Sequence, residues 1–439
     1  MNDGEDVFVF DRLMGITKLV SLATGTSATT GTGNSFLPII SRDGNSIVFL
    51  SKSDNLVPGI LDVPRTDVFV FDQIGETTSL VTRYAPGSAS LTGSDFSALT
   101  TSNSMSADGR FLVFTSSAVN LVPGQSDTID TADIFVFDRQ TGVTELVSRA
   151  AGTSTTTGNK ASGSPVISAD GRYIAFDSSA SNLVPGQTDT ASTTDIFVFD
   201  RQTGVTELVS RAAGTSTTTG NQFSLIPAIS ADGRYITFRS DATNLVPGQA
   251  DTNATADVFV FDHQTGTTEV VSRVAGTSTT TGNGLSVSAG ISADGRYIVF
   301  TSLATNLVSG QNDANNENDV FLFDRQMGTT EVVSRAAGFS ATTGNKVSTS
   351  PVINADGRYV VDFTALPIIN RTYVKMTSAK TLAQLVWAEK ELSDELSVLN
   401  WFKKTAEEAT GKIVTKDKSL SEEAAKFLWE CCYIKNGSY

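Results

Sequence analysis

The chain repeats itself, and this repetition limits what it can fold into more than any other feature. The string DIFVFDRQTGVTELVSRAAGTSTTTGN occupies residues 133–159 and returns unchanged at 195–221, 62 positions later. Six copies of one unit indicate a repeat architecture, in which each unit buries its apolar faces against its neighbours. Two markers define the unit. A hexapeptide D-[VI]-F-[VL]-F-D begins at Asp6, Asp67, Asp133, Asp195, Asp257 and Asp319, and a D-G pair has its aspartate at Asp43, Asp108, Asp170, Asp232, Asp294 and Asp356.

One period contains four short apolar segments separated by turn residues. In the third period these are SPVIS (164–168), YIAFDS (173–178), DIFVFD (195–200) and VTELVSR (205–211), which we call segments A, B, C and D. Their β-branched and aromatic residues are typical of strands, and the Asp-Gly pair between A and B is typical of a hairpin. Consecutive apolar residues in segment C predict a strand that is buried on both faces. Each period is therefore predicted to be a four-stranded antiparallel sheet.

The order of the segments predicts how the units are arranged. The chain begins with C and D alone (6–22), continues with five complete A–D sets, and ends with A and B alone (350–363). We therefore predict an all-β fold over residues 1–363. It is a six-bladed β-propeller of four-stranded antiparallel blades, closed by N- and C-terminal strands that share one blade. A chain that begins and ends inside a repeat is also what a piece of a longer array would look like, and that alternative stays open.

The composition changes at residue 364. Residues 364–439 are rich in Lys, Glu, Leu and Ala and contain all three tryptophans and both cysteines, Cys431 and Cys432. Apolar spacing predicts a helical C-terminal appendage of two amphipathic helices, at 378–412 and 419–437. A lid or docking arm and an appended segment of no shared function are both compatible with it. At the junction, YVVDFTA carries Asp362, which is predicted to invert the alternation of the last strand.

The composition also excludes several functions. A formal net charge of −15 has the wrong sign for a protein that binds the phosphates of nucleic acid. No apolar run reaches the roughly 18 residues that a membrane helix needs, and MNDGEDVFVF shows no secretory signal. The one histidine, His263, takes a turn position in DHQTG where sister repeats have arginine, and no G-x-S-x-G motif occurs. No catalytic residue or cofactor site is therefore assigned.

The two ends of each predicted blade differ. The A–B and C–D turns are tight, whereas the B–C and D–A connections are long, as in NLVPGQTDTASTT and AAGTSTTTGN. Long loops on a rigid scaffold are where binding sites concentrate. We therefore expect a non-catalytic scaffold that binds a protein or carbohydrate partner on this long-loop face. The alternatives are a polysaccharide-acting enzyme that uses loop-face carboxylates, and a calcium-stabilised extracellular or surface module.

Aspartates recur with constant spacing in the long B–C loops. Carboxylate and amide oxygens are the ligands that calcium prefers, and two loops carry the most of them. The opposing interpretation is that Asp and Asn serve the turns themselves. The D-G aspartates, such as Asp170, are predicted to be turn residues because every blade has one, and Arg211 and its equivalents are predicted to pair with nearby carboxylates. The candidate calcium ligands are Asp251, Asn253 and Asp257 in one loop and Asp313, Asn315, Asn318 and Asp319 in the next.

The stretches ISADGRYIAFDS and ISADGRYIVFTS, each followed by a D-[IV]-F-[VL]-F-D segment, resemble the TolB-like propeller repeats. That family has an S-P-D-G-[RK]-x-[IL]-x-F stretch at the start of each blade, and Ala169, Ala231 and Ala293 stand here where it often has proline. The resemblance covers residues 1–363 and none of the tail. It implies a propeller fold and a periplasmic or extracellular location. Its members include interaction proteins, peptidase-attached propellers and polysaccharide lyases, so it leaves the function open.

Overall fold

A computed structural model describes most of the repeat region and little of the tail. It describes residues 4–60, 65–83, 93–99, 103–127, 129, 131–189, 191–313, 315–364, 372–376 and 432–436. Within these ranges the chain forms strands and turns only. No helix there is long and apolar enough to cross a membrane.

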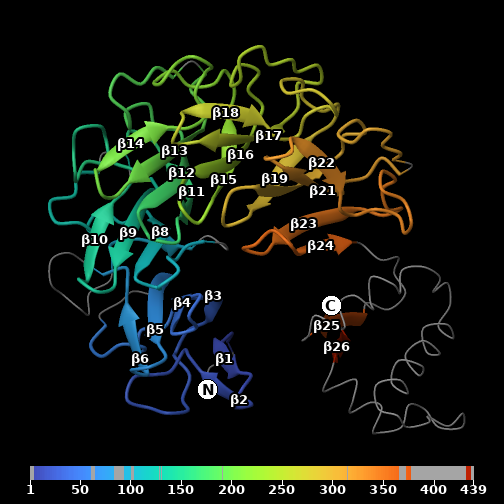
Figure 1. The fold of residues 1–439 in the computed structure, drawn as a ribbon. Coiled ribbons are helices and arrows are strands. Elements are labelled where there is room, and N and C mark those ends of the chain that lie inside the picture. Colours follow the sequence, from blue (N-terminus) through green and yellow to red (C-terminus); the bar gives the residue numbers. More distant parts are fainter. Residues whose placement is uncertain are drawn as a thin grey trace, which may run out of the picture.

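Five complete blades are arranged around a common axis, and each is a four-stranded antiparallel sheet in the predicted order A-B-C-D (Figure 1). The fold is therefore a β-propeller. The first blade has β3 (Ser35–Ile40), β4 (Ser46–Ser51), β5 (Asp67–Asp72) and β6 (Thr77–Leu80), and the second has β7 (Ser97–Ala98), β8 (Phe111–Ser116), β9 (Asp133–Asp138) and β10 (Val143–Leu146). The third has β11 (Ser162–Ile167), β12 (Tyr173–Ser178), β13 (Asp195–Asp200) and β14 (Val205–Leu208). The fourth has β15 (Ser224–Ile229), β16 (Tyr235–Ser240), β17 (Asp257–Asp262) and β18 (Thr267–Val270), and the fifth has β19 (Ser286–Ile291), β20 (Tyr297–Ser302), β21 (Asp319–Asp324) and β22 (Thr329–Val332).

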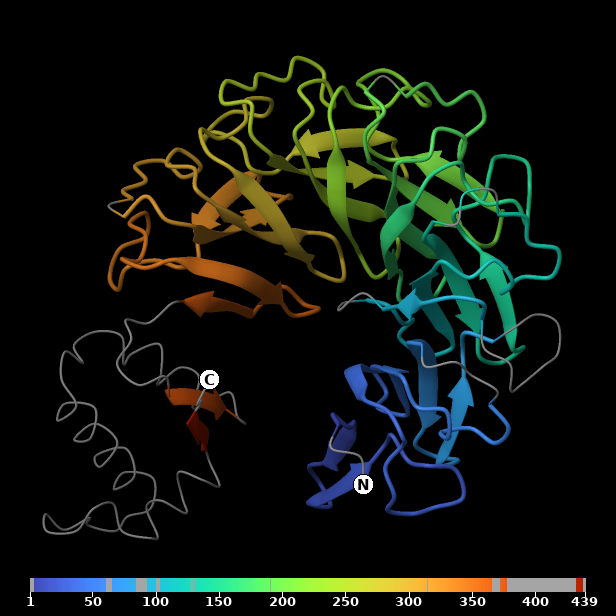
Figure 2. The same cartoon turned by 180° about the vertical axis from the view of Figure 1, so that it is seen from behind.

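The ring is open, which corrects the prediction of a shared closing blade. Among the described strands, β1 (Phe8–Asp11) at the N-terminus pairs only with β2 (Ile16–Leu19), and β23 (Ser348–Ile353) at the other end pairs only with β24 (Val360–Thr364). These two half-blades stand on opposite sides of the opening of an arc (Figures 1 and 2). One physical reason is visible in β24, where Asp362 takes the place of a phenylalanine that joins strands B and C in every complete blade.

The predicted inversion of β24 at Asp362 is also wrong. Val361 lies opposite Val352 and Phe363 opposite Thr349, in the same register as Ala175 with Val166 in the third blade. Asp362 is therefore a substitution within an unshifted strand and not an inserted residue.

Phenylalanines of strands B and C form the repeated core. Phe176 of β12 stacks on Phe197 of β13 with ring centroids 5.8 Å apart, and both side chains are fully buried. The faces of neighbouring blades share apolar clusters, as where Val136 of the second blade packs with Phe197 and Phe199 of the third. Segment C is buried on both faces, as predicted, because each blade lies between two others. Equivalent stacked pairs are Phe49–Phe69, Phe114–Phe135, Phe238–Phe259 and Phe300–Phe321.

The A–B turns are connected by backbone hydrogen bonds around the axis. The N–H of Ala169 donates to the carbonyl of Ala231 at 2.9 Å, and that of Ala231 donates to Ala293 at 3.0 Å. The same bond joins Ala107 to Ala169 and Ala293 to Ala355. Proline has no N–H group, so an alanine at this position permits an inter-blade bond that the proline of TolB-like repeats would not.

The long loops are held by pairing of their own. Thr188 of a B–C loop forms a parallel bridge with Thr218 of a D–A loop, and Arg211 pairs with Thr219 beside it. Asn221 then fastens the D–A loop to the next blade: its N–H donates to Asn244 Oδ1 at 3.0 Å, and its Nδ2 donates to Thr243 Oγ1 at 2.8 Å. Where the structure describes them, the long loops are therefore held by main-chain pairing and by uncharged polar side chains.

Most of the predicted helical appendage lies outside the described residues. The two described segments of the tail are strands, β25 (Thr372–Met376) and β26 (Cys432–Asn436), which pair antiparallel with each other. Residues 432–436 were expected inside the second helix, and this part of the prediction is wrong. Their sequence, CYIKN, contains a tyrosine and a β-branched isoleucine, which favour a strand when a partner strand is present.

Candidate functional site

In each complete blade, the first aspartate of strand C is a buried carboxyl group at the edge of the long-loop face. Asp257 is 1% exposed, and its Oδ1 accepts a hydrogen bond from Ser272 Oγ at 2.7 Å. The same hydroxyl accepts the N–H of Val258 at 2.9 Å, so one serine joins strand C to the segment that follows strand D. The equivalent pairs are Asp6–Ser21, Asp67–Thr82, Asp133–Ser148, Asp195–Ser210 and Asp319–Ser334.

Burial disfavours the charged form of these carboxyl groups. It raises the pKa of Asp133 to about 7, of Asp195 to about 8, of Asp257 to about 7 and of Asp319 to about 6. The serine donor offsets part of this rise in pKa, and a second carboxylate six residues earlier in each loop increases it. The four groups therefore hold protons at pH values where ordinary aspartates are ionised.

This proton binding predicts a pH dependence of stability. A carboxyl group whose pKa is raised by folding stabilises the fold fully below its ordinary pKa, and that contribution is lost as pH rises through the folded pKa. We expect the free energy of unfolding to fall between about pH 4 and about pH 8, by at most about 1.4 kcal/mol per pH unit for each group. Asp195→Asn, which stays neutral, should reduce this slope in urea melts at a series of pH values. An unchanged slope in the variant would show that Asp195 is ionised in the fold.

The earlier aspartate of each candidate calcium loop, Asp251 or Asp313, serves as a turn residue. Asp251 Oδ1 accepts the N–H groups of Asn253 at 3.0 Å and Ala254 at 3.1 Å, and Ala254 has a positive φ of 52°. Asp313 Oδ1 accepts the N–H groups of Asn315 and Asn316 at 3.1 Å. This is the Asx turn of the structural interpretation.

The geometry for calcium is incomplete in the protein atoms alone. The two aspartates of each loop lie close enough to interact. The negative charge of Asp251 contributes to the raised pKa of Asp257, and that of Asp313 contributes to the raised pKa of Asp319. Within the described ranges, however, no three Asp, Glu, His or Cys side chains are grouped as a metal would need. The other candidate ligands have these contacts: Asn253 Nδ2 donates to Gly282 O at 3.1 Å, Asn315 Nδ2 has no partner, and the Asn318 carbonyl accepts the N–H of Ser348.

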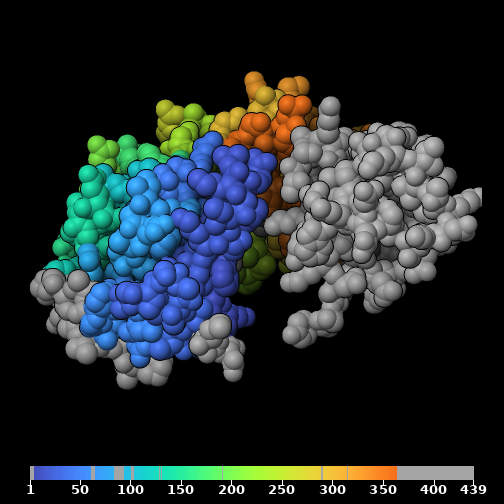
Figure 3. All heavy atoms as spheres, turned by 90° about the horizontal axis from the view of Figure 1, so that it is seen from below, coloured from blue at the N-terminus to red at the C-terminus, as the bar shows by residue number. Residues whose placement is uncertain are grey.

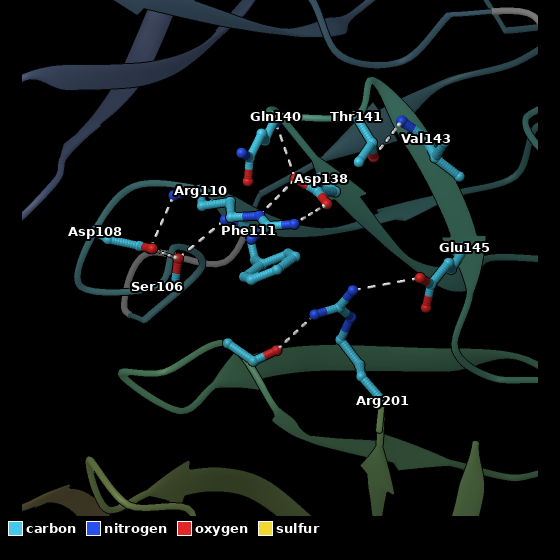
Figure 4. A network of polar contacts seen from close by, with 11 residues as sticks. Ser106, Asp108, Arg110, Phe111, Asp138, Gln140, Thr141, Val143, Glu145 and Arg201 are labelled. Atoms are coloured by element: carbon cyan, nitrogen blue, oxygen red, sulfur yellow. Dashed lines mark hydrogen bonds and ion pairs between the residues drawn. The ribbon is translucent and has the colours of Figure 1, made fainter. Parts of the chain in front are cut away.

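At the opposite end of the blades, the D-G turns form the junctions between neighbours (Figure 4). Asp108 Oδ1 accepts Ser106 Oγ at 2.6 Å and the N–H of Arg110 at 3.0 Å, which confirms the turn role predicted for this aspartate. Arg110 forms two hydrogen bonds with Asp138, at 2.9 and 2.7 Å, and lowers the pKa of Asp138 to about 2. Asp108, Arg110 and Asp138 thus all form hydrogen bonds within the protein.

An aromatic ring lies between two cations at this junction, which the sequence analysis missed. Phe111 has Arg110 on one side, 4.7 Å from the ring centroid, and Arg201 of the next blade on the other, at 3.9 Å. Arg201 also binds Glu145 at 3.3 Å and the carbonyl of Gly171 at 3.0 Å. The D-R-Q-x-G motif, which recurs every 62 residues, indicates a repeated role for this arginine, but it does not predict which residues of the neighbouring blade the arginine contacts.

The carboxylate pairing predicted for the arginine that ends segment D is confirmed for Arg211 but is not the main contact of Arg149. Arg149 donates to the carbonyl of Gly204 at 2.7 Å and lies 4.6 Å from the ring centroid of Phe199, so its partners are in the next blade and are not carboxylates. Arg211 does bind a carboxylate, Glu207, at 2.8 Å.

His263 replaces the junction arginine in the fourth blade. Its Nδ1 lies 2.9 Å from Glu207 Oε2, and its ring meets Tyr173 edge-on with centroids 5.1 Å apart. Arginine stays charged at any physiological pH, whereas histidine carries its charge only when protonated. Among the described junctions, this is the one where a histidine faces a carboxylate of the neighbouring blade in place of an arginine.

Restoring the arginine should stabilise the protein. His263→Arg is expected to raise the free energy of unfolding by about 0.5–1 kcal/mol, because a guanidinium group, which is always charged, would face Glu207. Arg325→His at the matched position, where Arg325 binds Glu269 at 3.1 Å, should lower it by a similar amount. Urea melts of both variants would test this, and stabilities equal to that of the native protein would contradict it.

Two hollows are present in the described surface. One of about 360 Å³ lies on the axis, among the A strands and A–B turns, and is lined by Ile167, Ile229, Ile291, Met105 and Arg42 with their neighbours. The other, of about 330 Å³, lies on the long-loop side between the second and third blades. Ala150 and Ala151 form one wall, and the other is formed by Ser181, Asn182 and residues 184–187, so its lining has no charged residue.

No protein-family model matches this chain, and no curated protein is similar to it in sequence. Solved structures with a similar fold are TolB and other β-propeller proteins. TolB from Acinetobacter baumannii is 14% identical over 74% of this chain, with a TM-score of 0.33, and the match spans 58% of that protein's length. A putative TolB from Agrobacterium tumefaciens is 16% identical over 83% of this chain and 98% of its own, with a TM-score of 0.37. An oligogalacturonate lyase in complex with manganese is 12% identical over 81% of this chain and 78% of its own, with a TM-score of 0.43.

Proposed function

We propose that this chain is a non-catalytic propeller scaffold that binds a protein or carbohydrate partner through its long-loop face. The observation that supports the proposal most is the pairing that holds the described long loops in place. Loops of one blade are paired with each other and fastened to the next blade through residues such as Asn221, so a partner meets a surface that loses little conformational freedom on binding. The hollow beside Ala151 offers a concave, uncharged contact on this side.

The carboxyl groups also favour binding over catalysis. Asp195 and its equivalents are buried and bonded to serine, and Asp138 is held by Arg110. The same arrangement recurs blade after blade, which is what an architectural role requires and a single active site does not.

The carbohydrate partner is tested by applying the labelled protein in solution to an array of immobilised neutral and acidic glycans. Ala151→Arg, which places a large cation in the uncharged hollow, should reduce binding of any glycan hit at least tenfold. Gln202→Arg, on an exposed C–D turn, is the matched control and should leave binding unchanged. Binding that is lost equally in both variants would contradict the assignment to the long-loop face, and release of fragments from a glycan would favour the lyase class.

Calcium stabilisation is a second candidate, favoured by one observation. Asp319 is 1% exposed, its Oδ2 has no hydrogen-bond partner, and the carboxylates of Asp313 and Asp362 lie near enough to raise its pKa. A cation would relieve the same repulsion that a proton relieves. Calcium at a hundredfold excess over its Kd would add about 2.7 kcal/mol, which should raise the melting temperature relative to chelator. Asp313→Asn should abolish the rise, and an unchanged midpoint in the native protein would reject calcium.

A further inference from the structure

Both ends of the arc expose apolar side chains whose counterparts inside the complete blades are buried. Phe8 and Phe10 of β1 are 58% and 60% exposed, whereas the equivalent Phe197 and Phe199 of β13 are 0% and 1% exposed. At the other end Val361 of β24 is 60% exposed. Figure 3 views the molecule from the open side of the arc, where N-terminal residues, in blue, form much of the near surface.

The two exposed ends are complementary halves of one blade. β23 and β24 are an A–B pair that lacks C and D, and β1 and β2 are a C–D pair that lacks A and B. In the third blade Ala175 of strand B lies opposite Val198 of strand C. Because β24 keeps the register of the complete blades, Val361 would lie opposite Val9 if β24 paired with β1. Among the described strands, each half-blade therefore has one sheet edge with no strand paired to it, of the kind that templates pairing with another strand.

One side-chain contact that recurs between neighbouring blades would have its arginine at one end of the arc and its partners at the other. Arg273 donates to the carbonyl of Gly328 at 2.9 Å and lies over the ring of Phe323. The next arginine in this series is Arg335, and the next glycine and phenylalanine are Gly15 and Phe10 at the far end of the chain. The two ends of the arc are thus complementary in three respects: their exposed apolar side chains, their unpaired strand edges, and the arginine of one end whose expected partners lie at the other.

We propose that the open ends dock a second copy of this chain, with β24 of one copy pairing with β1 of the other to complete a four-stranded blade between them. Within one copy the two half-blades belong to separate sheets on opposite sides of the arc's opening (Figures 1 and 2), so neither supplies the other's missing strands. The contact is head-to-tail and joins different surfaces of the two copies. This inference does not depend on the proposed function, because it involves the ends of the arc and not its loop face.

Asp362 makes this joint weaker than the complete blades and provides a way to strengthen it. In the shared blade it would face Phe8, at the position where Phe176 stacks on Phe197. Asp362→Phe should restore an aromatic pair and lower the dimer Kd by roughly tenfold, measured by light scattering over a concentration series.

Disulfide trapping distinguishes a second copy from closure of one copy on itself. In a background of Cys431→Ser and Cys432→Ser, Val9→Cys and Val361→Cys are made separately and together. Residues directly opposite in an antiparallel pair are within disulfide reach. Mixing the two single variants under oxidation should give a covalent dimer on a non-reducing gel. Lys18→Cys mixed with Val361→Cys is the control out of register and should give none.

Three results would overturn the proposal. The first is a double variant that forms only an internal cross-link, which would mean that the chain closes its own ring. The second is the absence of cross-linking in both the mixture and the double variant. The third is a light-scattering mass that stays monomeric for Asp362→Phe at every concentration.

Discussion

Replacing Phe197 with alanine is expected to lower the free energy of unfolding by about 4 kcal/mol. The side chain is fully buried in the third blade, stacks on Phe176 at 5.8 Å, and packs with Val136 of the second blade. Its loss would leave a cavity between two blades that their backbones are too constrained to fill. Because the stability of a repeat array depends on contacts between neighbours, the change should destabilise both blades. Urea denaturation followed by far-UV circular dichroism would measure this loss of stability.

The matched control is Phe8→Ala, at the same position of the repeat. Phe8 is 58% exposed in the N-terminal half-blade, so its removal should cost less than about 1 kcal/mol in dilute solution. A loss as large as that of Phe197→Ala would mean that Phe8 is buried in solution, as it would be in a completed sixth blade.

Gly233→Ala is expected to cost about 3 kcal/mol, from two causes that the repeat allows to be separated. Gly233, in the A–B turn of the fourth blade, has a positive φ of 75°, which strains any residue with a Cβ. An added Cβ would also lie 2.7 Å from Cγ and 2.9 Å from Cβ of Tyr173 in the third blade. Since Tyr173 already contacts Arg172 and His263, it has little freedom to move away.

Gly248→Ala isolates the backbone contribution. Gly248 has a φ of 71°, but an added Cβ there meets no atom within 4 Å. Its cost should be only about 1–2 kcal/mol of left-handed strain. If the two variants were equally destabilised in urea melts, the close approach of the D-G turn to the neighbouring blade would not contribute to stability.

Much of the fold was predictable because its determinants are local. Asp-Gly pairs mark the A–B turns, and Asp108 caps its turn through a side-chain oxygen within two residues. The unbroken apolar run of segment C predicted a strand covered on both faces, and Phe197 is so covered. Constant spacing then predicted sheets of four strands in chain order.

The candidate site was less predictable. Asp251 and Asp257 were selected by spacing, but spacing cannot say which oxygens are already occupied. The structure gives one oxygen of Asp257 to Ser272 and one of Asp251 to main-chain N–H groups. The junction cations were missed because Arg201 meets Glu145 across 56 residues of chain, a distance over which sequence pattern carries no geometry.

The amino-acid pattern alone specifies the repeated four-stranded unit, since strand periodicity and turn chemistry act over a few residues. Whether the first and last units meet was settled only in three dimensions. Closure depends on the accumulated rotation of five blades and on the packing of one pair of strands, and Asp362 removes an aromatic contact from that pair. Small differences at each blade junction add up around a ring, and no local pattern records their sum.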